Sequence, residues 1–143
     1  DKKGLVKKII SEILPPPEKY FKYWKEREYA EFENLLSTLE DFLKQGDMTS
    51  AEIVSVDSTK TILGLMFAME KKIEPHQYPG SKRILSASRK YLPKNNVEQV
   101  EKVLATHDLS ERFKLLKDLR SSLAEKDEWM KEYHQSLMKL KRE

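Results

Sequence analysis

The residues best suited to chemistry lie in residues 81–96, SKRILSASRKYLPKNN, a stretch without any acidic residue. Its five cations are Lys82, Arg83, Arg89, Lys90 and Lys94. Helical spacing places Lys82, Arg89 and Lys90 on one face, where they could contact phosphates while Tyr78 stacks on a base. The segment therefore predicts either a nucleic-acid-binding face or an ordinary solvated helix face beside the protein's own core.

Patterns typical of catalytic and metal-binding sites are missing from the sequence. The three histidines, His76, His107 and His134, are isolated and belong to no H-E-x-x-H or paired Glu-x-x-His motif. Four scattered glycines and no G-K-[ST] sequence argue against a phosphate-binding loop. The absence of cysteine excludes disulfides and thiolate metal sites. We therefore expect a non-catalytic protein with no cofactor and no metal.

Composition predicts an all-α fold. Charged residues make up 36% of the 143 residues, Leu, Lys and Glu dominate, and no β-branched run alternates with polar residues. We expect residues 1–143 to form a single-domain bundle of about seven helices. No apolar run reaches the roughly 18–20 residues of a membrane span, and the N-terminus lacks the features of a signal peptide. Because the chain starts without Met, we expect it to be part of a longer protein.

A short amphipathic helix and a long helix are predicted in the first 45 residues. Apolar residues from Leu5 to Leu14 form one face of the short helix, and Pro15, Pro16 and Pro17 end it. The long helix covers about residues 18–45, with an apolar stripe of Phe21, Trp24, Phe32, Leu35, Leu36, Leu39, Phe42 and Leu43. Tyr20, Tyr23 and Tyr29 surround its first half, either as an exposed aromatic patch or as half-buried packing residues.

The next stretch contains the clearest helix-start signals. Gly46 can adopt the left-handed conformation that closes the long helix. Thr49 and Glu52 match a capping box, and Met48 and Ile53 stand where a hydrophobic staple would form, so we expect a helix from Ser50. A second start is expected at Asp57 or Ser58, followed by Ile62, Leu65, Met66, Met69 and Ile73 at helical spacing.

The C-terminal third carries a seven-residue repeat. Short helices are expected from Ser81 and from Asn95 or Asn96, and a second long helix over about residues 109–142. One seam of that helix contains Leu116, Leu123, Met130 and Leu137. This spacing is typical either of a long helix packed on its own domain or of a coiled coil that pairs with another chain.

Residues 35–92 carry a pattern that has a counterpart in a known family. Its elements are Met48–Thr49, Glu52 to Val54, and Lys60 to Ile62 with Leu65. This order resembles the TFIIS N-terminal domain family, which includes the integrase-binding domain of LEDGF. Thr59 replaces the family's glycine, and Tyr91–Leu92 stands where a tryptophan is expected. Residues 1–92 would then form the family-like bundle, and residues 93–143 would add further helices.

The resemblance implies a protein-interaction module of a transcription or chromatin-associated protein that captures short disordered peptides. It implies a nuclear location, with a cytoplasmic one as the alternative. In the LEDGF-like branch the ligand lies between two interhelical loops, which correspond here to residues 14–18 and 73–78. The implied partner-binding residues are Leu14, Pro15, Glu18, Ile73, His76 and Tyr78. Two alternatives stay open: nucleic-acid binding through residues 82–94, and self-assembly through the C-terminal heptad helix.

Overall fold

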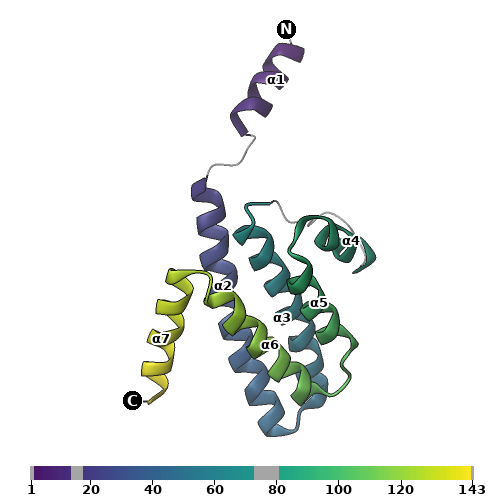
Figure 1. Cartoon of the computed structure of the whole chain (residues 1–143), viewed down its shortest axis with the longest axis vertical. Helices are drawn as coiled ribbons and strands as arrows, with labels where there is room; N and C mark the ends of the chain where they lie inside the picture. The colour runs from purple at the N-terminus through teal and green to yellow at the C-terminus, as the bar shows by residue number, and fades with distance from the viewer. Residues whose placement is uncertain (1, 14–17, 73–80, 143) are drawn as a thin grey trace.

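The computed structural model describes the backbone of residues 2–13, 18–72 and 81–142, and the side chains of residues 2–9, 18–72 and 85–142. These residues contain no strand, and the all-α prediction is confirmed (Figure 1). Seven helices are described: α1 (Lys2–Ile13), α2 (Glu18–Gln45), α3 (Met48–Met69), α4 (Ser81–Tyr91), α5 (Lys94–Ala105), α6 (Leu109–Ala124) and α7 (Glu128–Arg142).

Helices α2 and α3 form an antiparallel hairpin, against which α5 and α6 pack (Figure 1). The turn between them begins at Gly46, whose φ of +73° lies in the left-handed region. The amide of Gly46 donates to the Leu43 carbonyl, and the amide of Asp47 donates to the Phe42 carbonyl. This is the Schellman pattern, and the predicted role of Gly46 as the residue that ends the long helix is confirmed.

The start of α3 differs from the prediction. The helix begins at Met48, and Asp47 caps it by accepting from the Ser50 amide at 3.1 Å and from the Ser50 hydroxyl at 2.7 Å. A carboxylate satisfies these donors and also interacts favourably with the positive end of the helix dipole, so Asp47 displaces Thr49 as the cap. Met48 and Ile53 are 50% and 61% exposed, and the predicted staple is therefore wrong.

The predicted second helix start at Asp57 or Ser58 is also wrong, because α3 continues through both residues. The Ser58 hydroxyl donates to the Val54 carbonyl and the Thr59 hydroxyl donates to the Ser55 carbonyl, each at 2.8 Å. Hydroxyls that bond to their own preceding turn can be buried inside a helix. The residues that resembled a cap therefore lie within the helix.

The predicted long helix over residues 109–142 is two helices. The chain turns at residues 125–127, and the Asp127 carboxylate caps α7 by accepting from the Met130 amide at 3.0 Å. Helix α7 folds back beside α2 (Figure 1), and the Tyr29 ring of α2 meets the rings of Trp129 and Tyr133 edge to face. Aromatic contacts across this interface therefore hold α7 against α2.

One core joins the N-terminal and C-terminal parts of the chain. Its buried side chains include Tyr29, Phe32, Leu36, Leu39, Ile62, Leu65, Met66, Phe67, Val100, Val103, Leu116, Leu119, Leu123 and Met130. Tyr29 is fully buried, unlike the patch residues Tyr20 and Tyr23, which are exposed. The predicted self-association residues Leu116, Leu123 and Met130 pack inside this core, and Leu137 is only half-buried. These three side chains are therefore not on a free surface.

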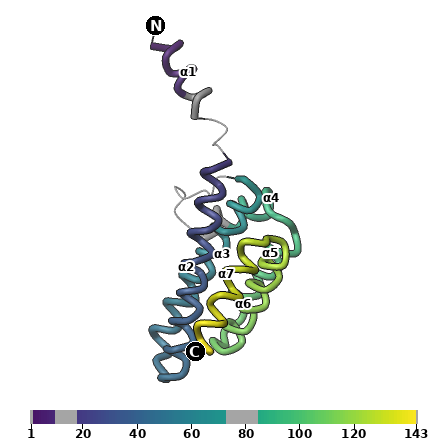
Figure 2. Tube along the Cα trace, turned by 90° about the vertical axis from the view of Figure 1, so that its left-hand side faces the viewer, coloured from purple at the N-terminus to yellow at the C-terminus, as the bar shows by residue number. Residues whose placement is uncertain are grey.

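Helix α1 lies beyond the start of α2 and apart from the other helices in both views (Figures 1 and 2). Its apolar side chains Leu5, Val6 and Ile9 are exposed. These three side chains therefore add little hydrophobic free energy to the bundle.

Candidate functional site: a lysine-lined groove

An open groove of about 410 Å³ lies where three parts of the bundle meet. The first turns of α2 form one wall, the end of α3 forms another, and the turn between α6 and α7 closes the third side. The lining residues are Glu18, Lys19, Phe21, Lys22, Lys25, Ala68, Met69, Lys71, Lys126 and Asp127. Groove volumes of this order are typical of sites that bind small molecules or single peptide side chains, about 300–1,000 Å³.

The apolar part of the groove comes from Phe21 of α2 and from Ala68 and Met69 of α3. Phe21 and Ala68 are 7% and 6% exposed, and Met69 is half-buried against the core. These side chains are anchored by the packing of α2 against α3. The groove therefore offers a preformed apolar floor, and a ligand that covers it gains hydrophobic free energy.

The rim of the groove is basic. Five lysines and two carboxylates line it, so its formal charge is five minus two, or +3. Asp127 Oδ2 accepts a hydrogen bond from the Lys25 ammonium at 2.6 Å, and Glu18 pairs with Lys71. Within the described part of the chain, the remaining lysines, Lys19, Lys22 and Lys126, have no ion-pair partner. The positive charge of the groove is therefore concentrated on these three side chains.

The end of α3 shapes one side of the groove. Lys71 has a φ of +52°, its amide donates to the Ala68 carbonyl at 3.1 Å, and the amide of Lys72 donates to the Phe67 carbonyl at 2.9 Å. This is a second Schellman motif, in which glycine usually takes the left-handed position. The hydrogen bond and the charge of the Lys71 ammonium lower the pKa of the Glu18 carboxyl. The pair joins the end of α3 to the start of α2.

Only one of the predicted partner-binding residues can be placed. Glu18 lines the groove and contacts Lys71, two residues before Ile73 in the sequence. Leu14, Pro15, Ile73, His76 and Tyr78 lie outside the described residues. Glu18 and Lys71 therefore bring together the two segments that lead into the predicted loops, and the described part of that region is a lysine-rimmed groove rather than a purely apolar pocket.

The lysines of the groove were missed at the level of sequence. Lys19, Lys22 and Lys25 recur every three residues in α2, which is a visible basic pattern. Lys126 and Asp127 could not be assigned to a site, because residues 109–142 were predicted to be one continuous helix. These two residues reach the groove because the chain turns between α6 and α7.

The basic segment of residues 81–96 is distributed over α4 and the start of α5. Arg89 Nε donates to Glu101 at 2.7 Å, and Lys94 lies 3.8 Å from Glu98, both acids being on α5. The Lys90 ammonium lies 5.1 Å from the centroid of the Tyr91 ring. The side chains of Lys82 and Arg83 lie outside the described residues. Neighbouring acids thus partly neutralise the predicted nucleic-acid face.

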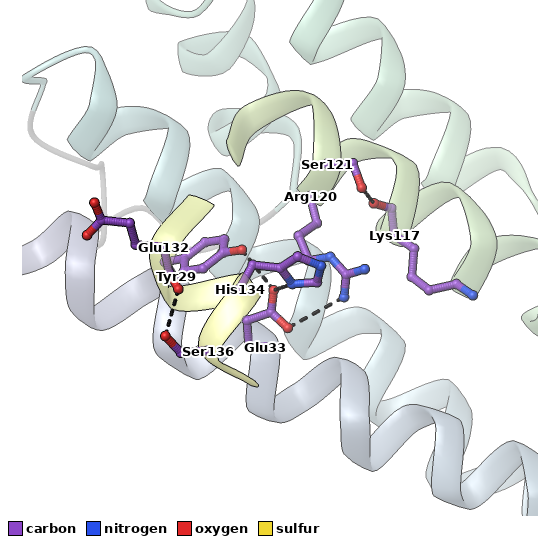
Figure 3. Close-up of polar contacts among 8 residues, drawn as sticks. All are labelled: Tyr29, Glu33, Lys117, Arg120, Ser121, Glu132, His134 and Ser136. Atoms are coloured by element: carbon purple, nitrogen blue, oxygen red, sulfur yellow. Dashed lines mark hydrogen bonds and ion pairs between the residues drawn. The ribbon is translucent and has the colours of Figure 1, made fainter. Parts of the chain in front are cut away.

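A second polar cluster lies buried between α2, α6 and α7 (Figure 3). The Tyr29 hydroxyl donates to Glu33 at 2.9 Å, and Arg120 Nη1 and His134 Nδ1 lie 3.4 Å and 3.3 Å from the same carboxylate. Burial and the neighbouring Glu33 charge raise the pKa of the Tyr29 hydroxyl far above its usual range. The cluster joins α2, α6 and α7, and none of its residues lines the groove.

Comparisons with protein-family models, curated proteins and solved structures found no match to this chain. In the described ranges, no group of three or more His, Cys, Asp or Glu side chains could hold a metal ion. No described helix is both long and apolar enough to cross a membrane. The proposed function therefore rests on the geometry and charge of the groove.

Proposed function

We propose that this protein is an interaction module that binds a short disordered peptide in the lysine-lined groove. The observation that carries the proposal is the preformed apolar floor of Phe21, Ala68 and Met69, placed between walls from three separate parts of the chain. Such a groove can receive one apolar side chain of a peptide, while the polar rim fixes the orientation of the flanking residues.

The resemblance of residues 35–92 to the TFIIS N-terminal domain family supports a setting in transcription or chromatin. On this proposal, the protein is nuclear, and its partners carry short peptide motifs in disordered segments. Fluorescence microscopy of the labelled protein tests the setting directly. Exclusion of the protein from the nucleus would contradict it, without affecting the proposal that the groove binds a peptide.

The peptide proposal is tested by selecting binders from a displayed library of disordered 12-residue peptides and measuring affinities by fluorescence anisotropy. Met69→Ala removes part of the groove floor, and we expect it to weaken the selected peptides by about 1 kcal/mol, or roughly fivefold. Leu104→Ala is the matched control, because Leu104 is a partly exposed apolar residue of α5 that does not line the groove.

Thermal melts of both variants establish that they are folded at the temperature of the binding measurement. The proposed function would be contradicted if the selected peptides bound the Met69→Ala variant as tightly as they bind the wild-type protein. It would also be contradicted if the library yielded no binder. Amide chemical-shift changes confined to Lys19, Lys22, Lys71 and Lys126 would locate the peptide in the groove.

A further inference from the structure

We infer that the ligand of the groove is an acidic peptide, in which an apolar anchor is flanked on both sides by carboxylate side chains. This inference rests on the proposed peptide-binding function and specifies the chemistry of the partner. It follows from the distribution of charge around the groove, from the geometry at Lys71, and from the small exposed aromatic area of the groove lining.

The three lysines that have no ion-pair partner in the described part of the chain come from two different walls of the groove. Lys19 and Lys22 are exposed on the first turns of α2, three residues apart and therefore neighbours on the helix surface. Lys126 is exposed on the α6–α7 turn, on another wall of the groove. A peptide whose apolar side chain occupies the floor would extend its flanking residues towards these lysines. Carboxylates at those positions would complement the positive charge and speed association.

Every cation that lines the groove is a lysine. An ammonium acts as a compact point charge with three donors and imposes no planar, two-pronged geometry on its partner. Carboxylates on a flexible peptide can meet such groups in several registers. The rim therefore favours acidic character in the ligand over one fixed arrangement of acceptors.

The backbone conformation of Lys71 and its pairing with Glu18 also support an acidic ligand. Lys71 occupies a left-handed position that glycine adopts without steric cost, and residues retained in such conformations are concentrated at functional sites. Its ammonium pairs with Glu18, and both side chains are largely exposed, at 61% and 83%. A ligand carboxylate can therefore compete with Glu18 for Lys71. The internal carboxylate acts as a placeholder for the carboxylate of the peptide.

The lining of the groove favours a peptide over a nucleic-acid strand. Phe21 is the one aromatic residue among the lining residues, and it is only 7% exposed, so the groove offers little stacking surface beside its lysines. A single strand requires such surfaces next to its phosphate contacts. The exposed Tyr23 ring is one helical turn from Lys19 but does not line the groove.

The test uses the full chain and four fluorescent probes. Three peptides share one central Leu-Phe anchor and differ in their flanks, which carry Asp and Glu, Asn and Gln, or Lys. The fourth probe is a 12-nucleotide single-stranded DNA of mixed sequence. Anisotropy titrations at low and high salt give the affinities. We expect the acidic peptide to bind at least tenfold more tightly than the neutral one at low salt, with the advantage shrinking as salt screens the charges.

Variants that lower or raise the positive charge of the groove test whether this charge determines the affinity for the acidic peptide. Lys19→Glu/Lys22→Glu should weaken the acidic peptide about tenfold or more, and Glu18→Gln should strengthen it about two- to threefold, because Glu18 no longer competes for Lys71. Lys60→Glu/Lys114→Glu is the matched control: it changes the net charge equally, at exposed positions in the middle of α3 and α6 that do not line the groove. We expect this control to change the affinity less than threefold.

The outcomes separate this inference from the proposed function. Equal binding of the acidic and neutral peptides, unaffected by Lys19→Glu/Lys22→Glu, would overturn the acidic partner while leaving a peptide-binding groove. Failure of every peptide, including those selected from the library, would overturn both. Preferential binding of the DNA, lost in Lys19→Glu/Lys22→Glu, would replace the acidic peptide by a nucleic acid at the same groove.

Discussion

At the scale of single residues, Lys71 adopts a left-handed backbone conformation beside the groove that is less stable for lysine than for glycine. A side chain in the left-handed region costs roughly 1–2 kcal/mol, whereas glycine there costs only its larger entropy in the unfolded chain, about 0.5–1 kcal/mol. Gly46 occupies the equivalent position at the end of α2, with a φ of +73°. The two helix ends of the hairpin thus use the same motif with different residues, and only the one beside the groove carries a charged side chain.

This contrast leads to a prediction for Lys71→Gly. Relief of the left-handed strain should leave the free energy of unfolding unchanged or raise it by up to about 1 kcal/mol. The affinity for the acidic peptide should fall, because the rim loses one ammonium. Chemical denaturation and anisotropy titration measure the two effects separately.

Lys60→Gly is the control for Lys71→Gly. Lys60 is exposed in the helical interior of α3, where glycine should lower the free energy of unfolding by about 1 kcal/mol without affecting the peptide. If Lys71→Gly destabilised the protein as much as Lys60→Gly, the left-handed conformation at position 71 would not be a source of strain.

At the scale of elements, the α6–α7 turn depends on Asp127, which has two functions. One carboxylate oxygen accepts from the Met130 amide and caps α7, and the other accepts from the Lys25 ammonium. The first contact fixes the helix start, and the second attaches the turn to α2. The position of this wall of the groove therefore depends on one side chain.

Substitution of Asp127 can separate these functions. Asn is as good a cap as Asp, so Asp127→Asn should keep α7 docked while freeing Lys25, and should strengthen the acidic peptide about two- to threefold. Asp127→Ala should cost about 1 kcal/mol of stability through the lost cap. Hydrogen exchange of the amides at the start of α7 reports the cap, and anisotropy reports the groove. Faster exchange in Asp127→Asn than in Asp127→Ala would contradict the assignment.

The sequence allowed the helices to be predicted more reliably than their ends. Apolar spacing predicted α2 over residues 18–45, and Gly46 marked its end. Asp57 and Ser58 gave a wrong prediction of a helix start within α3, because a buried serine whose hydroxyl bonds to its own turn has the same local sequence as a cap. The break before α7 had only a weak local signal. Asp127 is a favoured capping residue, but Glu125, Lys126 and Asp127 include neither glycine nor proline and the heptad continues through them.

The candidate site was predictable only where local sequence determined it. The resemblance led to Glu18, and the lysines of α2 were visible as a pattern. The groove itself depends on tertiary contacts. The Tyr29 ring packs against the rings of Trp129 and Tyr133 of α7, and the preceding turn contributes Lys126 and Asp127 to the groove lining. Contacts between residues about 100 positions apart cannot be inferred from periodicity in one chain.

At the scale of the whole molecule, α3 is the central helix. Residues 62–68 are all buried in succession, which a helix can achieve only when neighbours cover every side. Helices α2, α5 and α6 provide this cover, and Leu116, Leu119 and Leu123 of α6 belong to the same core as Ile62 and Leu65 of α3. A boundary at residue 92, as the resemblance implies, would therefore divide this core.

The last prediction follows from that shared core. A fragment of residues 18–92 leaves the α3 surface under α5 and α6 exposed, including the neighbours of Leu116, Leu119 and Leu123. Losing three fully buried leucines alone removes roughly 5–9 kcal/mol of hydrophobic free energy, comparable with the whole stability of a domain. We expect this fragment to show no cooperative thermal unfolding by circular dichroism and poorly dispersed amide resonances. Residues 18–142 are the control, which should unfold cooperatively within a few degrees of the full chain, because Leu5, Val6 and Ile9 of α1 are exposed. A fragment of residues 18–92 that melted cooperatively would show instead that the N-terminal part is an independent folding unit, with α5 to α7 added to its surface.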